Sequence, residues 1–168
     1  VTVIHIISDE NSTHNLEIIS TKKEQITTHI AHLKKTNNPI KKCFLFIKAF
    51  LKILQKVKNF DIVHLNEVYP FGIFSLYLKW FKNKQYIISE HFTGYHLPQA
   101  KKLAFNRLVI SKLITKNATF VCPVSNNLRD AMLALNLNAN YFRVPNVVNT
   151  NLFFPSENNN ATFTITHI

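Results

Sequence analysis

The sequence is poor in glycine and cysteine, and each scarcity excludes a class of protein. Only two of the 168 residues are glycine, against a usual share of ~7%. Loops that cradle phosphates need several glycines, so neither a dinucleotide-binding fingerprint nor a P-loop is encoded. The two cysteines, Cys43 and Cys122, lie far apart in apolar stretches, and the eight histidines are scattered. We therefore expect a reducing cytoplasm, no disulfide framework and no metal site.

Long apolar runs are also missing, since none approaches the ~20 residues needed to span a bilayer. With 46% hydrophobic residues, a chain of this length can still bury the core of one domain. The sequence opens directly on a strand-like run and starts another such run eight residues before its end. We therefore expect it to be a piece of a longer protein.

Acidic residues are few: nine Asp and Glu stand against twenty Lys and Arg, giving a net charge of +11 and a pI near 9.8. This balance favours anionic partners such as a membrane surface, nucleic acid or phosphorylated substrates. The chain is also rich in Lys, Asn, Ile and Phe together, which is typical of A/T-rich coding DNA and raises the lysine content without any function. The net charge alone leaves both explanations open.

Strand-like and helix-like segments alternate along the chain, which predicts an α/β fold. The expected strands are Val1–Ile7, His14–Ser20, Gln25–Leu33, Asp61–Leu65, Tyr86–Ser89, Thr119–Val124 and Tyr141–Val144. The expected helices cover about 39–59, 73–81, 99–116 and 126–135, the last with Ser125 as its N-cap. The first strand is a β-branched run typical of burial on both faces. The alternation implies right-handed crossovers and a doubly wound, mostly parallel sheet with helices on both faces.

The helix expected after Pro39 has an apolar face and a basic face. The apolar face comprises Phe46, Phe50, Ile53, Leu54 and Val57, and the opposite face carries Lys41, Lys48, Lys52 and Lys56, with Leu45 among them. Such lysines form either an ordinary solvated surface or a surface that contacts anionic lipid headgroups, at ~1 kcal/mol per lysine. Both interpretations remain open.

The stretch YIISEHFTGY has the pattern of a site. A strand ends at Glu90 and His91, and Thr93, Gly94 and Tyr95 then form a turn. Ligands bind at the carboxyl ends of parallel strands, so His91 is the leading candidate for a functional residue. A histidine that only bonds a neighbouring loop is an equally weighted alternative.

Polar residues lie at the carboxyl ends of several expected strands. They are His64, Asn66, Glu90, His91, Ser125 and Asn146. Because the carboxyl ends of parallel strands share one edge of a sheet, we expect these residues to face a common cleft.

Several of these segments together carry a family resemblance. SEHFTGY, CPVSNNLRDAM and PNVVNTNLFFP, with DIVHLN followed by YPFG, resemble the amino-terminal half of a family 4 glycosyltransferase of the GT-B architecture, from about Val1 to Pro155. The resemblance implies that residues 1–150 form a Rossmann-like acceptor-side domain, one half of a GT-B fold, without its first βα unit. Residues 151–160 would be an interdomain linker, and residues 161–168 would begin a truncated donor-side domain.

The resemblance also implies a reaction. A sugar would pass from a nucleotide-sugar donor to a glycan or lipid-linked acceptor, with retention at the anomeric carbon and without a metal or cofactor. The missing domain would bind most of the donor, and His91 matches the family's histidine that reaches toward the donor sugar and phosphate. The implied substrate-binding residues are Glu90, Thr93, Gly94, Tyr95, Asn66, Tyr69, Gly72, Ser125, Asn126 and Asn146.

This sequence departs from the family pattern at three points. Asn66 stands where the family often has a second histidine, and Asn149 stands where aspartate is usual. The family's glycine-containing loop before the first strand is absent, so the acceptor site is expected to be incomplete.

The leading hypothesis is therefore a cytoplasmic glycosyltransferase domain, peripheral at the inner face of the membrane through its lysine-faced helix and inert alone. The alternative is a stand-alone basic module that binds membrane or nucleic acid without catalysis. Aromatic residues are not interleaved with lysines as a base-stacking platform would require, so no nucleic-acid partner is expected for the enzyme. A third hypothesis, a GT-B-like sugar-nucleotide epimerase, is disfavoured by PNVV and SEHFTGY.

Overall fold

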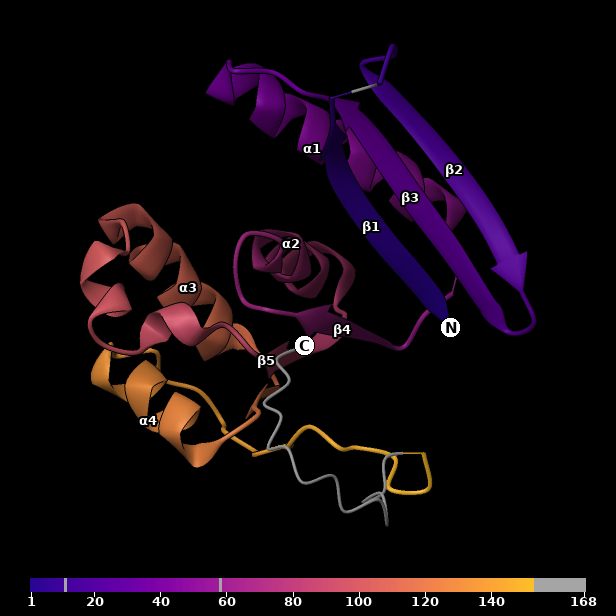
Figure 1. The fold of residues 1–168 in the computed structure, drawn as a ribbon. Helices are drawn as coiled ribbons and strands as arrows, with labels where there is room; N and C mark the ends of the chain where they lie inside the picture. Colours follow the sequence, from indigo (N-terminus) through magenta and orange to yellow (C-terminus); the bar gives the residue numbers. More distant parts are fainter. Residues whose placement is uncertain (11, 58, 153–168) are drawn as a thin grey trace, which may run out of the picture.

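The computed structural model describes residues 1–10, 12–57 and 59–152 of the chain (Figure 1). Within them, six strands form two three-stranded sheets, in the orders β1-β3-β2 and β4-β5-β6. The strands are β1 (Thr2–Asp9), β2 (Leu16–Lys23), β3 (Ile26–Lys34), β4 (Ile62–Asn66), β5 (Gln85–Glu90) and β6 (Phe120–Pro123). Only β2 and β3 pair antiparallel, while the other three pairings are parallel. The predicted mostly parallel α/β fold is confirmed, with two sheets in place of one.

Four α-helices accompany the described strands. They are α1 (Pro39–Lys56), α2 (Gly72–Lys82), α3 (Phe105–Asn117) and α4 (Asn126–Ala134), with short 3₁₀ turns η1 (Thr93–Tyr95) and η2 (Gln99–Lys102). Asn38 caps α1 by accepting hydrogen bonds from the N–H groups of Ile40 and Lys41. The single helix predicted over 99–116 is wrong: η2 and α3 replace it, because Ala104 is extended (ψ 140°) and Leu103 packs against the core.

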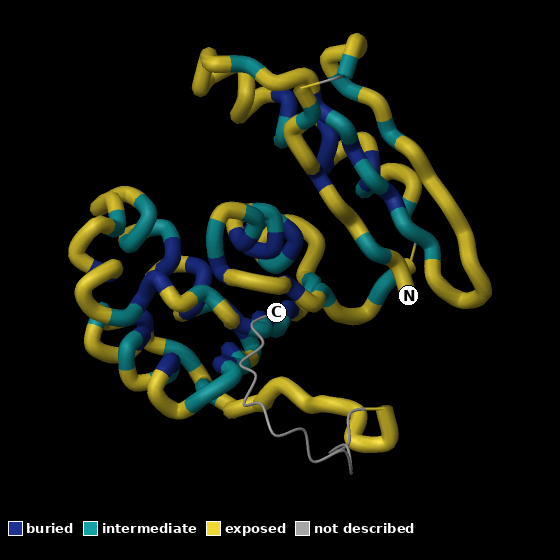
Figure 2. Tube along the Cα trace, in the orientation of Figure 1, coloured by how far each residue is buried: buried dark blue, intermediate teal, exposed yellow. Residues whose placement is uncertain are grey.

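Two hydrophobic cores stabilise the fold, one for each sheet. The core of the second sheet includes Tyr86, Ile88, Val121, Ile114, Leu128 and Met132. The core of the first sheet includes Ile6, Ala31, Leu33, Leu45, Ala49, Phe50 and Ile53, together with Leu78 of α2. Figure 2 shows these buried segments on the inner sides of the helices and strands. The rings of Phe50 in α1 and Phe74 in α2 stack with centroids 4.3 Å apart, so the two helices join the two halves.

Leu45 does not belong to the basic face of α1, as the sequence pattern had suggested. Its side chain is buried in the core of the first sheet. The buried residues of α1 are Leu45, Ala49, Phe50 and Ile53, so the buried stripe of the helix extends to the side that carries the lysines.

Strand β1 is far more exposed than a strand buried on both faces. Ile4 and Ile7 are 38% and 42% exposed, and among its apolar residues only Ile6 is buried. β1 pairs with β3 on one edge, and α1 contacts the first sheet from one side (Figure 1). A β-branched run is therefore compatible with a strand that is covered on one side only.

The last expected strand, Tyr141–Val144, is reduced to a single parallel bridge between Tyr141 and Val121 of β6. The N–H of Phe142 donates to the Val121 carbonyl (3.0 Å), and the N–H of Val144 donates to the Pro123 carbonyl (3.2 Å). The ladder bond between them is missing because Pro123 has no N–H to donate. The segment thus runs beside β6 without completing a strand.

Among the described helices, none combines the length and the apolar composition needed to cross a bilayer. Apart from residues 151 and 152, the expected linker (151–160) and the expected strand of a second domain (161–168) lie outside the described residues.

Candidate functional site

The second sheet brings the predicted site residues to one edge. β4, β5 and β6 are adjacent and parallel, with Asn66 opposite Ser89 and Glu90 opposite Pro123. Asn66, Glu90 and the residues that follow β6 therefore lie at the same end of the sheet, as predicted. We call this end the rim; Asn146 also lies near it, because Val144 is bonded to Pro123 at the end of β6.

Glu90 connects two loops of the rim. Its side chain is fully buried, and its Oε2 accepts a hydrogen bond from the N–H of Val68 at 2.9 Å. Its Oε1 accepts from the N–H groups of His91 (2.9 Å) and Phe92 (2.8 Å). Burial raises the pKa of the Glu90 carboxyl above its ordinary value and outweighs the three N–H bonds, which lower it; the nearby charge of Glu67 raises it further. The placement favours a positioning role over direct contact with a substrate.

His91 differs from Glu90 because its side chain is exposed. Its imidazole makes no hydrogen bond or ion pair with any described residue, whereas its backbone N–H is held by Glu90. Thr93, also exposed, begins η1 two residues later. The backbone of His91 is held in place, and its ring nitrogens are free of described partners. The side chain is therefore available to contact a ligand.

Three predicted site residues are buried and pack the elements around the rim. A Cβ at Gly94 would lie 2.2 Å from Cζ of Phe92, and a Cβ at Gly72 would lie 2.7 Å from Cγ2 of Ile114. Both glycines thus allow close approaches that no other residue would. The ring of Tyr95 meets Phe92 edge-on, and burial raises the pKa of its hydroxyl well above the ordinary value. These placements favour structural roles.

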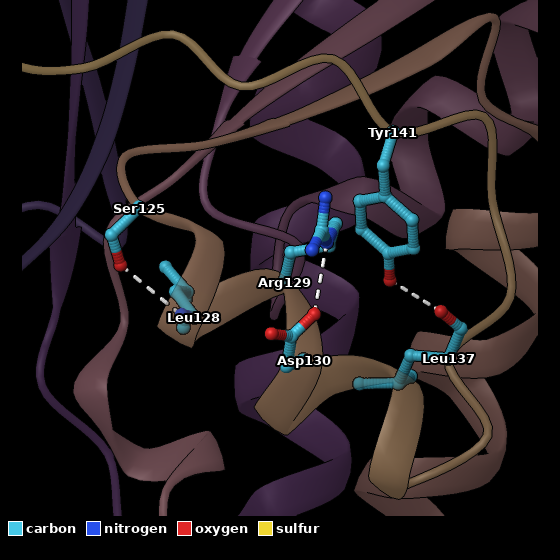
Figure 3. Close-up of polar contacts among 6 residues, drawn as sticks. All are labelled: Ser125, Leu128, Arg129, Asp130, Leu137 and Tyr141. Carbon is cyan, nitrogen blue, oxygen red and sulfur yellow. Dashed lines mark hydrogen bonds and ion pairs between the residues drawn. The ribbon is translucent and has the colours of Figure 1, made fainter.

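Ser125 begins α4 at the end of β6, as predicted (Figure 3). Its Oγ accepts a hydrogen bond from the N–H of Leu128 at 3.1 Å, which satisfies one of the free donors of the helix. Asn126 and Asn146 are exposed and keep their side-chain amides available. In the same view the Tyr141 hydroxyl donates to the carbonyl of Leu137, and burial raises the pKa of Tyr141 to about 12.

Arg107 of α3 lies between the two rim loops and was not predicted from the sequence. Its guanidinium carbon is 4.9 Å from the ring centroid of Tyr69 and 4.3 Å from that of Phe92. Tyr69 is therefore part of the rim through its contact with Arg107. The sequence provided one indication that Arg107 has no acidic partner nearby in the chain, since residues 91–129 contain no aspartate or glutamate.

The four lysines of α1 that were predicted to contact a membrane are all exposed. Lys52 and Lys56 also line a shallow hollow together with Leu16 and Ile18 of β2. Within residues 1–10, 12–57 and 59–152, no three His, Cys, Asp or Glu residues cluster closely enough to hold a metal ion. Independence from metals stays a prediction.

Replacing Glu90 by glutamine tests the role of this carboxylate. A carboxamide offers one acceptor oxygen and turns its NH₂ toward an N–H donor, so we expect the free energy of unfolding to fall by about 1–3 kcal/mol. Urea unfolding of the wild type and of Glu90→Gln measures the difference. Glu17→Gln, in an exposed position of β2, is the matched control and should change stability little.

The same pair of proteins has an expected pH dependence. Because the pKa of Glu90 is raised in the folded state, its contribution to stability is complete at a pH below the unfolded pKa and is lost as the pH rises through the folded pKa. The stability advantage of the wild type over Glu90→Gln should therefore shrink with rising pH. An advantage that grows with pH would contradict the assigned direction.

Comparisons with known proteins agree with this geometry. Residues 3–152 match Glycosyltransferase Family 4. No curated protein matches the chain. Among solved structures, sucrose-phosphate synthase from Thermosynechococcus elongatus is similar in fold, with a TM-score of 0.61 and 19% sequence identity over 92% of this chain. The match spans 40% of that enzyme's chain. Since the family match covers most of the sequence, the chain belongs to glycosyltransferase family 4, and its described part is an α/β domain similar to those of GT-B enzymes.

Proposed function

We propose that this chain is the amino-terminal, acceptor-side domain of a retaining glycosyltransferase, which moves a sugar from a nucleotide-sugar donor to a lipid-linked or polysaccharide acceptor. The observation that carries the proposal is the exposed, unpaired imidazole of His91 at the end of β5, in a chain of glycosyltransferase family 4. A histidine in this setting is available to a ligand at the edge of the sheet where ligands of α/β folds bind.

His91 is the catalytic residue of the proposal. A ring N–H can donate a hydrogen bond to a hydroxyl of the donor sugar or to a phosphate oxygen. Such a bond strengthens as negative charge develops on the leaving diphosphate, and stabilisation of developing charge is commonly a large part of catalysis. Glu90 supports the reaction indirectly, since its two oxygens fix the backbone on which His91 is carried.

The exposed amides of the rim are the proposed contacts to the acceptor. Asn66 ends β4, Asn126 begins α4 just after β6, and Asn146 follows the segment beside β6; all three are exposed. A side-chain amide both donates and accepts hydrogen bonds, which suits the hydroxyl groups of a sugar. The nucleotide sugar is a substrate in this proposal, and no metal or further cofactor takes part.

The outer face of α1 is the proposed membrane contact. Ile40, Phe44, Ile47 and Leu51 recur at helical spacing, and each is at least 40% exposed. Lys41 and Lys48 are exposed on the same helix. An exposed apolar stripe beside lysines is typical of a helix that lies in the interface of an anionic membrane. We propose that this face holds the enzyme at the cytoplasmic surface of the membrane.

The His91→Ala variant of the complete enzyme tests the catalytic proposal. Removing one donor to a developing charge should lower kcat by about 10²–10³-fold, with a smaller change in KM. His14→Ala, at an exposed position before β2, is the control and should leave kcat unchanged. The 168-residue chain alone should transfer no sugar. Full activity of His91→Ala, or transfer by the chain alone, would contradict the proposal.

Vesicle binding tests the membrane proposal. Replacing Lys41 and Lys48 together by glutamine removes about 2 kcal/mol of attraction and should weaken binding to vesicles that contain phosphatidylglycerol about 30-fold. The control replaces Lys112 and Lys116, two exposed lysines of α3, and should weaken binding much less. Equal losses for both pairs would mean that only net charge matters. Phe44→Ser should also weaken binding without any change of charge.

A further inference from the structure

Arg107 contacts two aromatic rings that come from different loops. Tyr69 follows β4 and Phe92 follows β5, and their ring centroids are 4.9 Å and 4.3 Å from the guanidinium carbon. The position of Phe92 is fixed twice: Glu90 binds its N–H, and its ring lies against Gly94 where a Cβ would collide. The side chain of Arg107 is thus pre-ordered, and most of the rotamer freedom that binding would cost is already lost.

The hydrogen-bond donors of this ordered guanidinium are unused. Its Nε is buried and has no partner among the described residues. Nη1 and Nη2 also make no hydrogen bond or ion pair with a described residue, and they are not buried, so both reach solvent. A buried donor without an acceptor costs free energy, and partly buried charges are usually paired. The two cation–π contacts stabilise the cation but do not satisfy its N–H groups.

The chain segment that carries Arg107 is basic, and Arg107 forms no ion pair with a described residue. Residues 91–129 contain six basic residues and no aspartate or glutamate; the six are Lys101, Lys102, Arg107, Lys112, Lys116 and Arg129. Both oxygens of Glu90 are occupied by backbone N–H groups. The two acidic residues near this part of the rim are Glu67, which is exposed, and Glu90, which is buried, and neither is paired with the guanidinium of Arg107.

We infer that Arg107 binds an oxyanion of the acceptor, either a phosphate or a carboxylate, at the edge of the rim. A guanidinium presents two N–H groups in a planar fork that matches two oxygens of either group, and charge-assisted pairs of this kind are among the strongest hydrogen bonds. The acceptor substrate of this site would therefore carry a negatively charged phosphate or carboxylate group. The assignment of the oxyanion to the acceptor rests on the proposed function. The existence of an oxyanion site at Arg107 does not.

A titration of the isotopically labelled 168-residue chain tests this inference without any sugar transfer. The chain contains three arginines, Arg107, Arg129 and Arg143, so its Nε–H signals are few enough to assign by NMR with single variants. Inorganic pyrophosphate and glucuronate are added separately at constant ionic strength. The Arg107 signal should shift and saturate with one of them, while the signals of the other two arginines drift without saturation.

The two probes identify the source of the oxyanion. Saturation by pyrophosphate alone indicates an acceptor that carries phosphate, and saturation by glucuronate alone indicates an acidic sugar; either result supports the inference. Arg107→Lys keeps the positive charge but loses the planar pair of N–H donors. The variant should therefore bind the saturating probe about tenfold more weakly, or weaker still. Arg129→Lys is the matched control and should bind like the wild type.

Failure of this inference is distinct from failure of the proposed function. An Arg107 signal that saturates with neither probe would overturn the oxyanion site, as would unchanged binding by a folded Arg107→Lys. If that variant does not fold, the titration of the wild type decides alone. Saturable binding in a protein whose complete form transfers no sugar would leave the oxyanion site standing and refute the proposed function.

Discussion

The candidate site depends on one buried carboxylate. The last residue of β5 is Glu90, and its two oxygens accept three backbone N–H groups from two loops. A carboxylate without such partners would be too costly to bury. Without this carboxylate, the loop after β4 would lose the bond of Val68, and the loop after β5 would lose the bonds of His91 and Phe92. The interaction therefore fixes the backbone of both loops at the end of the sheet where the exposed His91 lies.

The other features of the rim follow from this arrangement. The loop after β4 brings Tyr69, and the loop after β5 brings Phe92, into contact with Arg107. Gly94 allows the ring of Phe92 to lie against the turn, and Gly72 allows α2 to approach Ile114 of α3. The two glycines of a glycine-poor chain are thus used where side chains would collide. The rim presents an exposed imidazole, exposed amides and a guanidinium on a support that is already ordered.

The features of the fold and of the rim that could be predicted from the sequence are those with local causes. The strand before His91 and the cap at Ser125 were predicted because an apolar run and a capping hydroxyl act on their own neighbours. The shared rim was predicted because parallel strands of one sheet end at the same edge. Local pattern was enough in each case.

The parts that could not be predicted depend on contacts between distant segments. Glu90 resembles a ligand-binding acid in the sequence, and its bond to Val68 is set by the pairing of β4 with β5. Arg107 meets a ring 38 residues earlier in the chain, and no local pattern announces this contact. Likewise, the β-branched run of β1 cannot show that its strand lies at the edge of a sheet. Burial is a property of the assembled fold.

The most direct measurement is amide hydrogen exchange of Val68, His91 and Phe92 in the 168-residue chain. If the Glu90 carboxylate ties the two loops together, these three loop amides should exchange as slowly as amides of β5, and all three should lose protection together in Glu90→Gln. The exposed Thr93, whose N–H has no bond to Glu90, supplies the internal comparison. Fast exchange of the three amides in the wild type would contradict the account.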